Sequence, residues 1–341
     1  MIRQLILLLA IGISHAQWNH NRTECKAWVK RHNAAGNSTW RAKLAPSINY
    51  EDESEMQHLI GARLSPNFNS VLVADYKPRA RLLQNLPTSY DLRNVYPKCA
   101  SLTFVRNQYS CGGCWAFATM NSLSDRTCIK TYGQATPMQR GWSFQDMLEC
   151  CDEATCGVAP TQGCNGGYLD GAYLYALRTG VVTGEQANDS KNCKPYFINS
   201  FVGLLPAPTC RSYCTNPLFT KSYATDRMRI RGVKAYSSQT MAMEDFILAV
   251  KDALIRRGTL SAFLEIHEDF YAYSSGVYQV SFPNLLGYHA VRVIGWGVEN
   301  GVRYWLCVNS WGEYWGDRGN FKILMGQNTA GIERYMIEGV L

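Results

Sequence analysis

The sequence predicts an α+β fold, with a helical half followed by a sheet-rich half and a cleft between them. Three observations support this prediction. Apolar residues recur at helical spacing through much of residues 114–178. From residue 260 onward, strand signals dominate, and two apolar runs flank the turn Glu299-Asn300-Gly301. The composition, 46% hydrophobic and 18% charged over 341 residues, is typical of a globular protein.

Residues 1–16 have the features of a signal peptide. Arg3 precedes a short apolar run at residues 5–13, and Ala16 ends a stretch suited to cleavage. The run is too short to span a bilayer, and no later stretch reaches the apolar length that a membrane helix needs. We therefore expect a soluble mature protein. The net charge of +7 comes from scattered residues rather than a basic run, so we expect no nucleic-acid partner.

Residues 17–85 differ in composition from the rest of the chain. They are polar and contain a single cysteine, Cys25, with helical patches at residues 24–31 and 52–61. Residues 78–81, with the sequence Pro-Arg-Ala-Arg, resemble an exposed linker. The segment could be a small domain. A removable pro-segment agrees better with the character of the chain after residue 85, so we predict a mature domain at residues 86–341.

The periodic segments of the mature domain come in a definite order. Ser143 and Asp146 form a capping pattern before one helix, and Gly180 and Gly258 come after the ends of two others. The expected helices are residues 114–128, 143–150, 168–178 and 243–255; the expected strands are residues 260–266, 278–280, 289–297 and 302–308.

Cys114 is the strongest candidate for chemistry. It lies where a glycine-containing loop becomes a helix, and a helix N-terminus favours the thiolate that acts as a nucleophile. A buried or disulfide-bonded cysteine is one alternative. A redox pair with Cys111 is another, but no thioredoxin-like βαβ pattern surrounds the two residues.

A thiolate needs a histidine, and the mature region has two. His267 lies in an acidic run, so we expect a surface role for it, whereas His289 begins a strand. Asn309 ends the strand that faces His289 across the hairpin. We expect its amide oxygen to accept a hydrogen bond from Nδ1–H of His289, with Trp311 covering the pair. The backbone N–H of Cys114 and the side-chain amide of Gln108 are the expected donors to an oxyanion.

These motifs resemble those of papain-like cysteine peptidases, and of cathepsin B among them. Gly113 is a mild departure, because serine or alanine usually stands there. The resemblance extends from about Trp18 to the end of the chain. It rests on Leu86-Pro87, Gln108 to Phe117, Cys150-Cys151, the run Cys164-Asn165-Gly166-Gly167-Tyr168, Cys193-Lys194-Pro195-Tyr196, Trp296 to Gly301, Asn309-Ser310-Trp311 and Gly331-Ile332-Glu333, with Asn37 to Trp40 in the pro-region.

The resemblance implies a two-subdomain papain-like fold, with a helical half, a β-barrel-like half and the active-site cleft between them. It implies an endopeptidase with no cofactor or metal, whose pro-segment runs backwards through the cleft and is cut off near Leu86. The implied partners are protein or peptide substrates, the pro-segment itself and cystatin-type inhibitors of a monomeric enzyme. Gly166, Gly167, Trp311, Tyr288 and Tyr335 would contact substrate. The implied location is the secretory pathway, ending in the lysosome or outside the cell.

Thirteen cysteines after a signal peptide indicate disulfides in an oxidising compartment. By resemblance, Cys114, Cys25 and Cys307 stay unpaired. Other connectivities remain open from sequence, as does a zinc cluster of Cys150, Cys151, Cys156 and Cys164. The implied pairs are Cys99–Cys128, Cys111–Cys164, Cys150–Cys210, Cys151–Cys156 and Cys193–Cys214.

Three departures from cathepsin B bear on function. Tyr288 replaces a glycine before the catalytic histidine, which keeps open an inactive binding or matrix protein on the same fold. Tyr335 replaces an acidic residue at the base of the S2 pocket, which holds the second residue before the scissile bond (P2), so we expect apolar P2 residues. Residues 197–209 are shorter than the family's occluding loop and lack its histidines, so we expect no dipeptide-removing activity. Candidate glycosylation sites are Asn21, Asn37 and Asn188.

Overall fold

The computed structural model describes residues 22–63, 65, 86–131, 141–156, 163–184, 191–198 and 209–341. Several predictions lie outside the described residues: the signal peptide at 1–16, the linker at 78–81, the glycosylation candidates Asn21 and Asn188, and most of the segment 197–209. We refer to the described residues 22–63 and 65 as the N-terminal segment.

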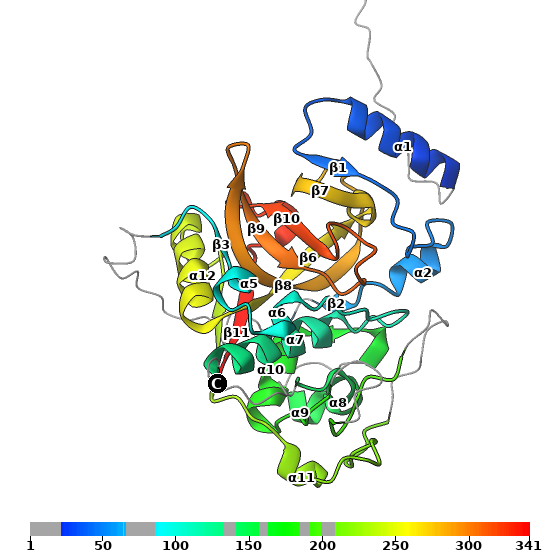
Figure 1. The fold of residues 1–341 in the computed structure, drawn as a ribbon. Helices are drawn as coiled ribbons and strands as arrows, with labels where there is room; N and C mark the ends of the chain where they lie inside the picture. Colours follow the sequence, from blue (N-terminus) through cyan, green and yellow to red (C-terminus); the bar gives the residue numbers. More distant parts are fainter. Residues whose placement is uncertain are drawn as a thin grey trace, which may run out of the picture.

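The helical half lies below the sheet in Figure 1 and is centred on α7. Ser143 caps α8, because its hydroxyl accepts from the backbone N–H of Asp146 at 3.0 Å. Phe117 of α7 stacks on Phe144 of α8 with ring centroids 4.4 Å apart, which joins the two helices. The elements are α5 (Leu92–Val95), α6 (Ala100–Thr103), α7 (Cys114–Lys130), α8 (Phe144–Cys150), α9 (Glu153–Cys156), η1 (Gly163–Asn165), β4 (Gly167–Tyr168), α10 (Leu169–Arg178) and α11 (Tyr223–Asp226).

The other half is a strongly curved sheet, with α12 on its outer side (Figure 1). Its strands, within the described residues, run in the order β1-β7-β10-β9-β8-β6-β11-β5, and β3 pairs with β8. Only β7 and β10 in this described sheet pair in parallel. The elements are β3 (Tyr90–Asp91), β5 (Gly232–Tyr236), α12 (Met243–Arg257), β6 (Leu260–His267), η2 (Glu268–Ala272), β7 (Tyr273–Tyr278), β8 (Leu285–Glu299), β9 (Val302–Val308), β10 (Asn320–Leu324), η3 (Thr329–Gly331) and β11 (Met336–Val340).

Local signals located most of these elements. Asn300 and Gly301 both adopt positive φ, of 50° and 81°, as the tight turn between β8 and β9 requires. The prediction of a strand at 278–280 was wrong, since β7 ends at Tyr278. Beyond it the chain turns, and the backbone N–H groups of Ser281 and Phe282 donate to the carboxylate of Asp269.

The N-terminal segment joins both halves of the molecule. Its elements are α1 (Arg22–Ala34), β1 (Trp40–Ala42), α2 (Glu53–Gln57) and β2 (Ala62–Arg63). Strand β1 extends the sheet by pairing with β7, whereas β2 pairs with β4 of the helical half. Ile60 belongs to the apolar core of the sheet half, and Ala62 belongs to the core of the helical half. The segment therefore crosses the junction between the halves at Gly61.

Candidate active site

Cys114 is the first residue of α7 and is fully buried. The first N–H groups of a helix have no intrahelical acceptor, so this position favours a negative sulfur. Trp115 fixes the helix start, because its indole Nε1 donates to the carbonyl of Gly163 at 3.2 Å. The loop before the helix is tied to η1 by the disulfide between Cys111 and Cys164.

His289 in β8 and Asn309, the residue after the end of β9, form a buried pair. The imidazole Nε2 lies 2.7 Å from Oδ1 of Asn309, and the same oxygen accepts the backbone N–H of Ser310 at 2.7 Å. The expectation that Nδ1 would face Asn309 was wrong; Nδ1 has no hydrogen-bond partner. Ala290, the next residue in β8, presents its backbone N–H to the Cys114 sulfur. Strand β8 therefore brings the residue next to His289 to the start of α7, and Nδ1 of His289 is buried without a hydrogen-bond partner.

Gln108 is held rigidly beside this pair. Its side-chain Nε2 donates to the carbonyl of Cys111 at 2.8 Å, and its Oε1 accepts the hydroxyl of Ser310 at 2.5 Å. The hydroxyl of Tyr196 also donates to the backbone carbonyl of Gln108 at 2.8 Å. Sequence reasoning missed Ser310 and Tyr196 as positioning residues, although both lie inside the motifs that carry the family resemblance.

The N-terminal segment makes hydrogen bonds to these residues. The carbonyl of Leu59 accepts from Nε2 of Gln108 at 3.1 Å and from the indole of Trp311 at 2.9 Å. The ring of Trp311 lies 4.9 Å from that of His289, so it covers the pair as expected. The backbone N–H groups of Gly61 and Ala62 approach the sulfur of Cys114. The expected oxyanion donor, Gln108, is thus occupied by a carbonyl of the same chain.

Glycines allow the close approach at this point. A Cβ on Gly61 would lie 2.1 Å from the carbonyl oxygen of Gly112, which leaves no space for any side chain. Gly61 donates to the carbonyl of Tyr288 at 3.1 Å and accepts from the N–H of Gly167 at 2.9 Å. Gly166 has a φ of +114°, a conformation that favours glycine. The expected substrate contacts Gly166 and Gly167 therefore lie along the N-terminal segment.

Burial keeps both expected catalytic groups neutral in this form of the protein. Loss of solvent raises the pKa of Cys114 to about 12, which outweighs the backbone N–H groups that favour the thiolate. Loss of solvent also lowers the pKa of His289 to about 4, although its hydrogen bond to Asn309 works in the opposite direction. Both groups are therefore uncharged near neutral pH while the N-terminal segment is in place.

Tyr288 and Tyr335 lie on either side of an aromatic residue that the sequence did not single out. Phe263 of β6 has its ring centroid 5.0 Å from that of Tyr288 and 5.3 Å from that of Tyr335. Phe263 and Tyr335 are buried, and Ala62 of the N-terminal segment belongs to the same apolar cluster. The side chain of Tyr288 packs along this aromatic wall.

The cysteines form the five pairs that the resemblance implied: Cys99–Cys128, Cys111–Cys164, Cys150–Cys210, Cys151–Cys156 and Cys193–Cys214. Each cysteine of the zinc alternative is thereby committed to a disulfide. The redox alternative fails because Cys111 is bonded to Cys164. Cys25, Cys114 and Cys307 are free and buried.

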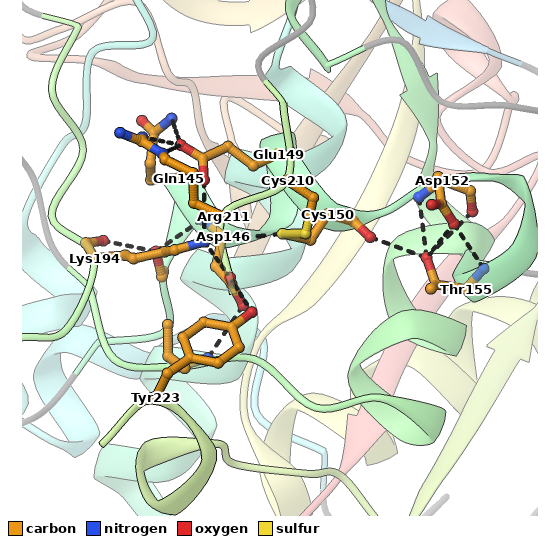
Figure 2. Close-up of a disulfide and its surroundings, with 12 residues drawn as sticks. Gln145, Asp146, Glu149, Cys150, Asp152, Thr155, Lys194, Cys210, Arg211 and Tyr223 are labelled. Atoms are coloured by element: carbon orange, nitrogen blue, oxygen red, sulfur yellow. Dashed lines mark hydrogen bonds and ion pairs between the residues drawn. A yellow bond between two sulfur atoms is a disulfide. The ribbon is translucent and has the colours of Figure 1, made fainter. Parts of the chain in front are cut away.

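Buried charges join α8 to residues on either side of the segment 197–209 (Figure 2). Lys194 is fully buried, and its Nζ lies 2.9 Å from Asp146 and 3.0 Å from Glu149. Arg211, next to the disulfide-bonded Cys210, pairs with Glu149. Burial alone would raise the pKa of Glu149, but the hydrogen bond from Arg211 and the charge of Lys194 outweigh it and hold the pKa below its ordinary value. We call Asp146, Glu149, Lys194 and Arg211 the ion cluster.

Other expected residues lie away from this centre. His267 is half-buried, and it pairs with Leu285 at the end of β6, three residues beyond the Leu264 that pairs with His289. Asn37 is exposed in a turn before β1. Among the described residues no helix is long and apolar enough to cross a bilayer.

Comparisons with known proteins agree with this geometry. Residues 86–340 match the family model described as papain family cysteine protease. Cathepsin B-like cysteine proteinase 4 of Caenorhabditis elegans is 32% identical over 89% of this chain and 88% of its own length. Cathepsin B-like cysteine proteinase 6 of the same organism is 35% identical over 75% of this chain and 67% of its own. In structure, procathepsin B S9 from Trypanosoma congolense matches with a TM-score of 0.74 and 28% identity, over 92% of this chain and 97% of that one.

Proposed function

Because the chain belongs to the papain family of cysteine proteases, we propose that it is the precursor of a cathepsin B-like endopeptidase with Cys114 as its nucleophile. His289 is the acid and base, Asn309 orients the imidazole, and Gln108 with the backbone N–H of Cys114 stabilises the oxyanion. The observation that carries this assignment is the hydrogen bond that Nε2 of Gln108 donates to the Leu59 carbonyl at 3.1 Å, two residues before Gly61, whose backbone N–H acts to lower the pKa of Cys114.

The proposed reaction has two stages. The Cys114 thiolate attacks the peptide carbonyl, and the oxyanion that forms receives hydrogen bonds from its two donors. The C–N bond breaks as protonated His289 gives its proton to the leaving amine, which leaves a thioester. Water then attacks the thioester and gives a proton to His289, and the S–C bond breaks to release the acid and restore the thiolate.

The N-terminal segment is, in this proposal, an inhibitory pro-segment released by cleavage near Leu86. It pairs in parallel with β4, the strand that contains Gly167. A substrate that ran in the opposite direction would pair antiparallel with the same strand. Its carbonyl group would then approach Gln108 in a different orientation from that of Leu59. In this proposal the N-terminal segment runs in the opposite direction to a substrate. That difference is the reason why the segment can pass Cys114 without being cleaved there.

We propose endopeptidase rather than dipeptide-removing activity. The chain has no histidine between His58 and His267, so the segment at residues 197–209 cannot grip a terminal carboxylate with imidazole groups. Tyr288 packs on Phe263 instead of standing free in the cleft. A peptide with a free C-terminus and its amidated twin should be cleaved at similar rates. Sequential release of dipeptides from the free acid alone would contradict this.

The disulfides favour an oxidising compartment, so we propose passage through the secretory pathway to the lysosome or the cell exterior. Asn37 is the glycosylation candidate whose exposure suits modification. The proposed partners are peptide substrates, the pro-segment and cystatin-type inhibitors, acting on a monomer.

The test combines a thiol-directed vinyl-sulfone probe with peptide mapping on the activated enzyme. We expect label on Cys114, and we expect Cys114→Ser to lose both label and turnover, because a serine hydroxyl does not ionise at neutral pH. Cys307→Ala removes another buried free thiol and should keep both. Turnover by Cys114→Ser close to that of the wild type would refute the assignment.

A further inference from the structure

The residue after the expected oxyanion donor has a strained backbone conformation. Tyr109 has a φ of +52°, a positive value that residues with a Cβ seldom adopt. A flip of the peptide group between Gln108 and Tyr109 by about half a turn would return Tyr109 to a negative φ, because such a flip changes ψ of the first residue and φ of the second together. The observed conformation therefore needs contacts that hold this peptide group in place.

Side-chain hydrogen bonds hold this peptide group on both sides. The backbone carbonyl of Gln108 accepts the hydroxyl of Tyr196 at 2.8 Å. The backbone N–H of Tyr109 donates to Oδ1 of Asn107 at 2.9 Å. A flip would break both bonds. Because Tyr196 is fully buried, water could not replace the carbonyl as the acceptor for its hydroxyl, so the flipped state would leave a buried donor unpaired.

The helical half fixes Tyr196 in turn. The ring of Tyr196 packs edge-on against Phe117 of α7, with centroids 5.0 Å apart and an interplanar angle of 85°. Two residues earlier, the N–H of Lys194 donates to the carbonyl of Thr183 at 2.9 Å, and the carbonyl of Lys194 accepts the hydroxyl of Ser143 at 2.7 Å. The hydroxyl of Tyr196 is thus presented from a rigid support, which lets it favour one orientation of the peptide group.

The conformation at Tyr109 also sets the acceptor that orients the Gln108 amide. The carbonyl of Tyr109 accepts the N–H of Cys111 at 2.8 Å, and the carbonyl of Cys111 accepts Nε2 of Gln108 at 2.8 Å. A side-chain amide nitrogen has two hydrogens. The bond to Cys111 uses one of them, and the other is directed to the Leu59 carbonyl at 3.1 Å, where we expect the oxyanion to form.

We propose that the hydroxyl of Tyr196 holds the peptide group between Gln108 and Tyr109 against a flip and thereby keeps the Gln108 amide aimed at the oxyanion. Tyr196 is a positioning residue in this inference, which rests on the proposed function, because it acts through Gln108 and touches no reacting atom. Without the hydroxyl, the strained and flipped states would both be populated, and the carbonyl of Cys111 would no longer hold the amide in one place. The loss falls on the transition state, in which the oxyanion needs its donors.

The experiment measures kcat and KM separately, for the activated enzyme on one fluorogenic peptide. Tyr196→Phe removes the hydroxyl and keeps the ring. Tyr173→Phe is the matched control, because Tyr173 is also fully buried and its hydroxyl donates to the backbone carbonyl of Ile337, at 3.2 Å, instead of that of Gln108. Thermal melting of both variants measures what each hydroxyl contributes to stability alone.

We expect Tyr196→Phe to lower kcat about tenfold and to change KM by less than about twofold, since it loosens the oxyanion donor without removing it. Tyr173→Phe should keep the kcat of the wild type. In a Gln108→Ala background, Tyr196→Phe should change kcat by less than about twofold, because its effect passes through the Gln108 amide.

Tyr109→Gly tests the part played by backbone strain. Glycine adopts a positive φ without the steric penalty, so the peptide group needs less support, and Tyr196→Phe should lower kcat less than about threefold in this background. An equal loss in the Tyr109→Gly and wild-type backgrounds, or a tenfold loss that persists without the Gln108 amide, overturns the inference. Cleavage of the peptide by the wild type would still leave the proposed function standing. If the wild type does not cleave the peptide, the proposed function fails and this inference fails with it.

Discussion

The cleft at Cys114 and the ion cluster at Lys194 are both shielded from solvent, but they treat charge in opposite ways. In the cleft, burial raises the pKa of Cys114 to about 12 and lowers that of His289 to about 4, so both groups are neutral. In the ion cluster, Lys194 keeps two carboxylates within 3.0 Å. The partners of Lys194 come from residues after 86, whereas the residues that bury Cys114 include Gly61 and Ala62 of the N-terminal segment. In the proposed precursor, release of that segment would restore the charge at Cys114 and leave the ion cluster unchanged.

The largest expected effect concerns the thiol itself. At pH 7 the full-length chain should be alkylated by iodoacetamide at Cys114 on the order of a hundredfold more slowly than a chain without residues 17–85, because thiolate is the reactive form. Mass spectrometry of the labelled peptide gives the rates. Cys114→Ser supplies the background from other thiols. Equal rates for the two chains would mean that the N-terminal segment does not control the charge of Cys114.

The second effect tests the permanently paired region. Replacing Lys194 by Met leaves Asp146 and Glu149 without their central cation, and removing one member of a buried pair costs about 3 to 5 kcal/mol. Urea unfolding of the activated domain measures the loss of free energy.

Arg303→Met is the control for this variant, because the Arg303–Glu244 pair is exposed, with 46% and 66% of the two side chains accessible. An exposed pair contributes at most about 1 kcal/mol. If Lys194→Met costs no more than Arg303→Met, the ion cluster does not brace the fold.

The third effect tests how closely the N-terminal segment packs against the backbone at Gly112. Gly61→Ala forces a methyl group against the backbone of Gly112, and overpacking of this kind costs about 1 to 3 kcal/mol. We expect an isolated N-terminal segment that carries Gly61→Ala to bind the activated enzyme more weakly than the wild-type segment does. Its inhibition constant should be higher by about tenfold or more.

Gly232→Ala in the enzyme is the matched control. A Cβ at that position meets only Val340, at 3.8 Å, so inhibition should not change. Inhibition by the Gly61→Ala segment that equals the wild type would show that the contact with Gly112 relaxes without cost.

The sequence predicted those features that depend on neighbours along the chain. The helix that begins at Cys114, the cap at Ser143 and the hairpin at Asn300 all follow from short-range rules. Strands β5, β10 and β11 were not predicted. They are short, and long-range pairing with other strands, which no local pattern encodes, defines them.

The site shows the same division. The residue types at Cys114, His289 and Asn309 were identified from motifs, but the ring nitrogen that faces Asn309 was not, since it depends on how β8 and β9 pack.

The smallest expected effect concerns the pH at which the N-terminal segment is released, and it depends on His32. Its ring lies 5.0 Å from that of Trp28 and 4.1 Å from that of Trp40, and its Nε2 is 3.1 Å from the hydroxyl of Ser38. Trp40 in turn packs on Tyr278 of β7, with centroids 5.2 Å apart. Protonation of His32 would therefore disturb the contact between the N-terminal segment and the sheet.

The direction of this pH effect is set by the causes of the pKa shift. Burial lowers the pKa of His32; the hydrogen bond to the Trp40 carbonyl works against burial, and the charge of Arg41 adds to it. The folded segment thus binds a proton less readily than the unfolded one. The stability that the neutral ring provides is present above the unfolded pKa of about 6.5 and is lost as pH falls below it.

Replacing His32 by Phe keeps the aromatic packing and removes the proton site. We expect the pH at which half of the full-length chain becomes active to fall by about half a unit, a shift consistent with a single linked proton. Melting temperatures at pH 7.5 and pH 5 separate this from a simple packing effect: the variant should differ from the wild type more at pH 5, and in the stabilising direction. A loss of stability that is equal at both pH values, with an unchanged activation midpoint, would show that His32 is only a packing residue and that acid acts on the N-terminal segment elsewhere.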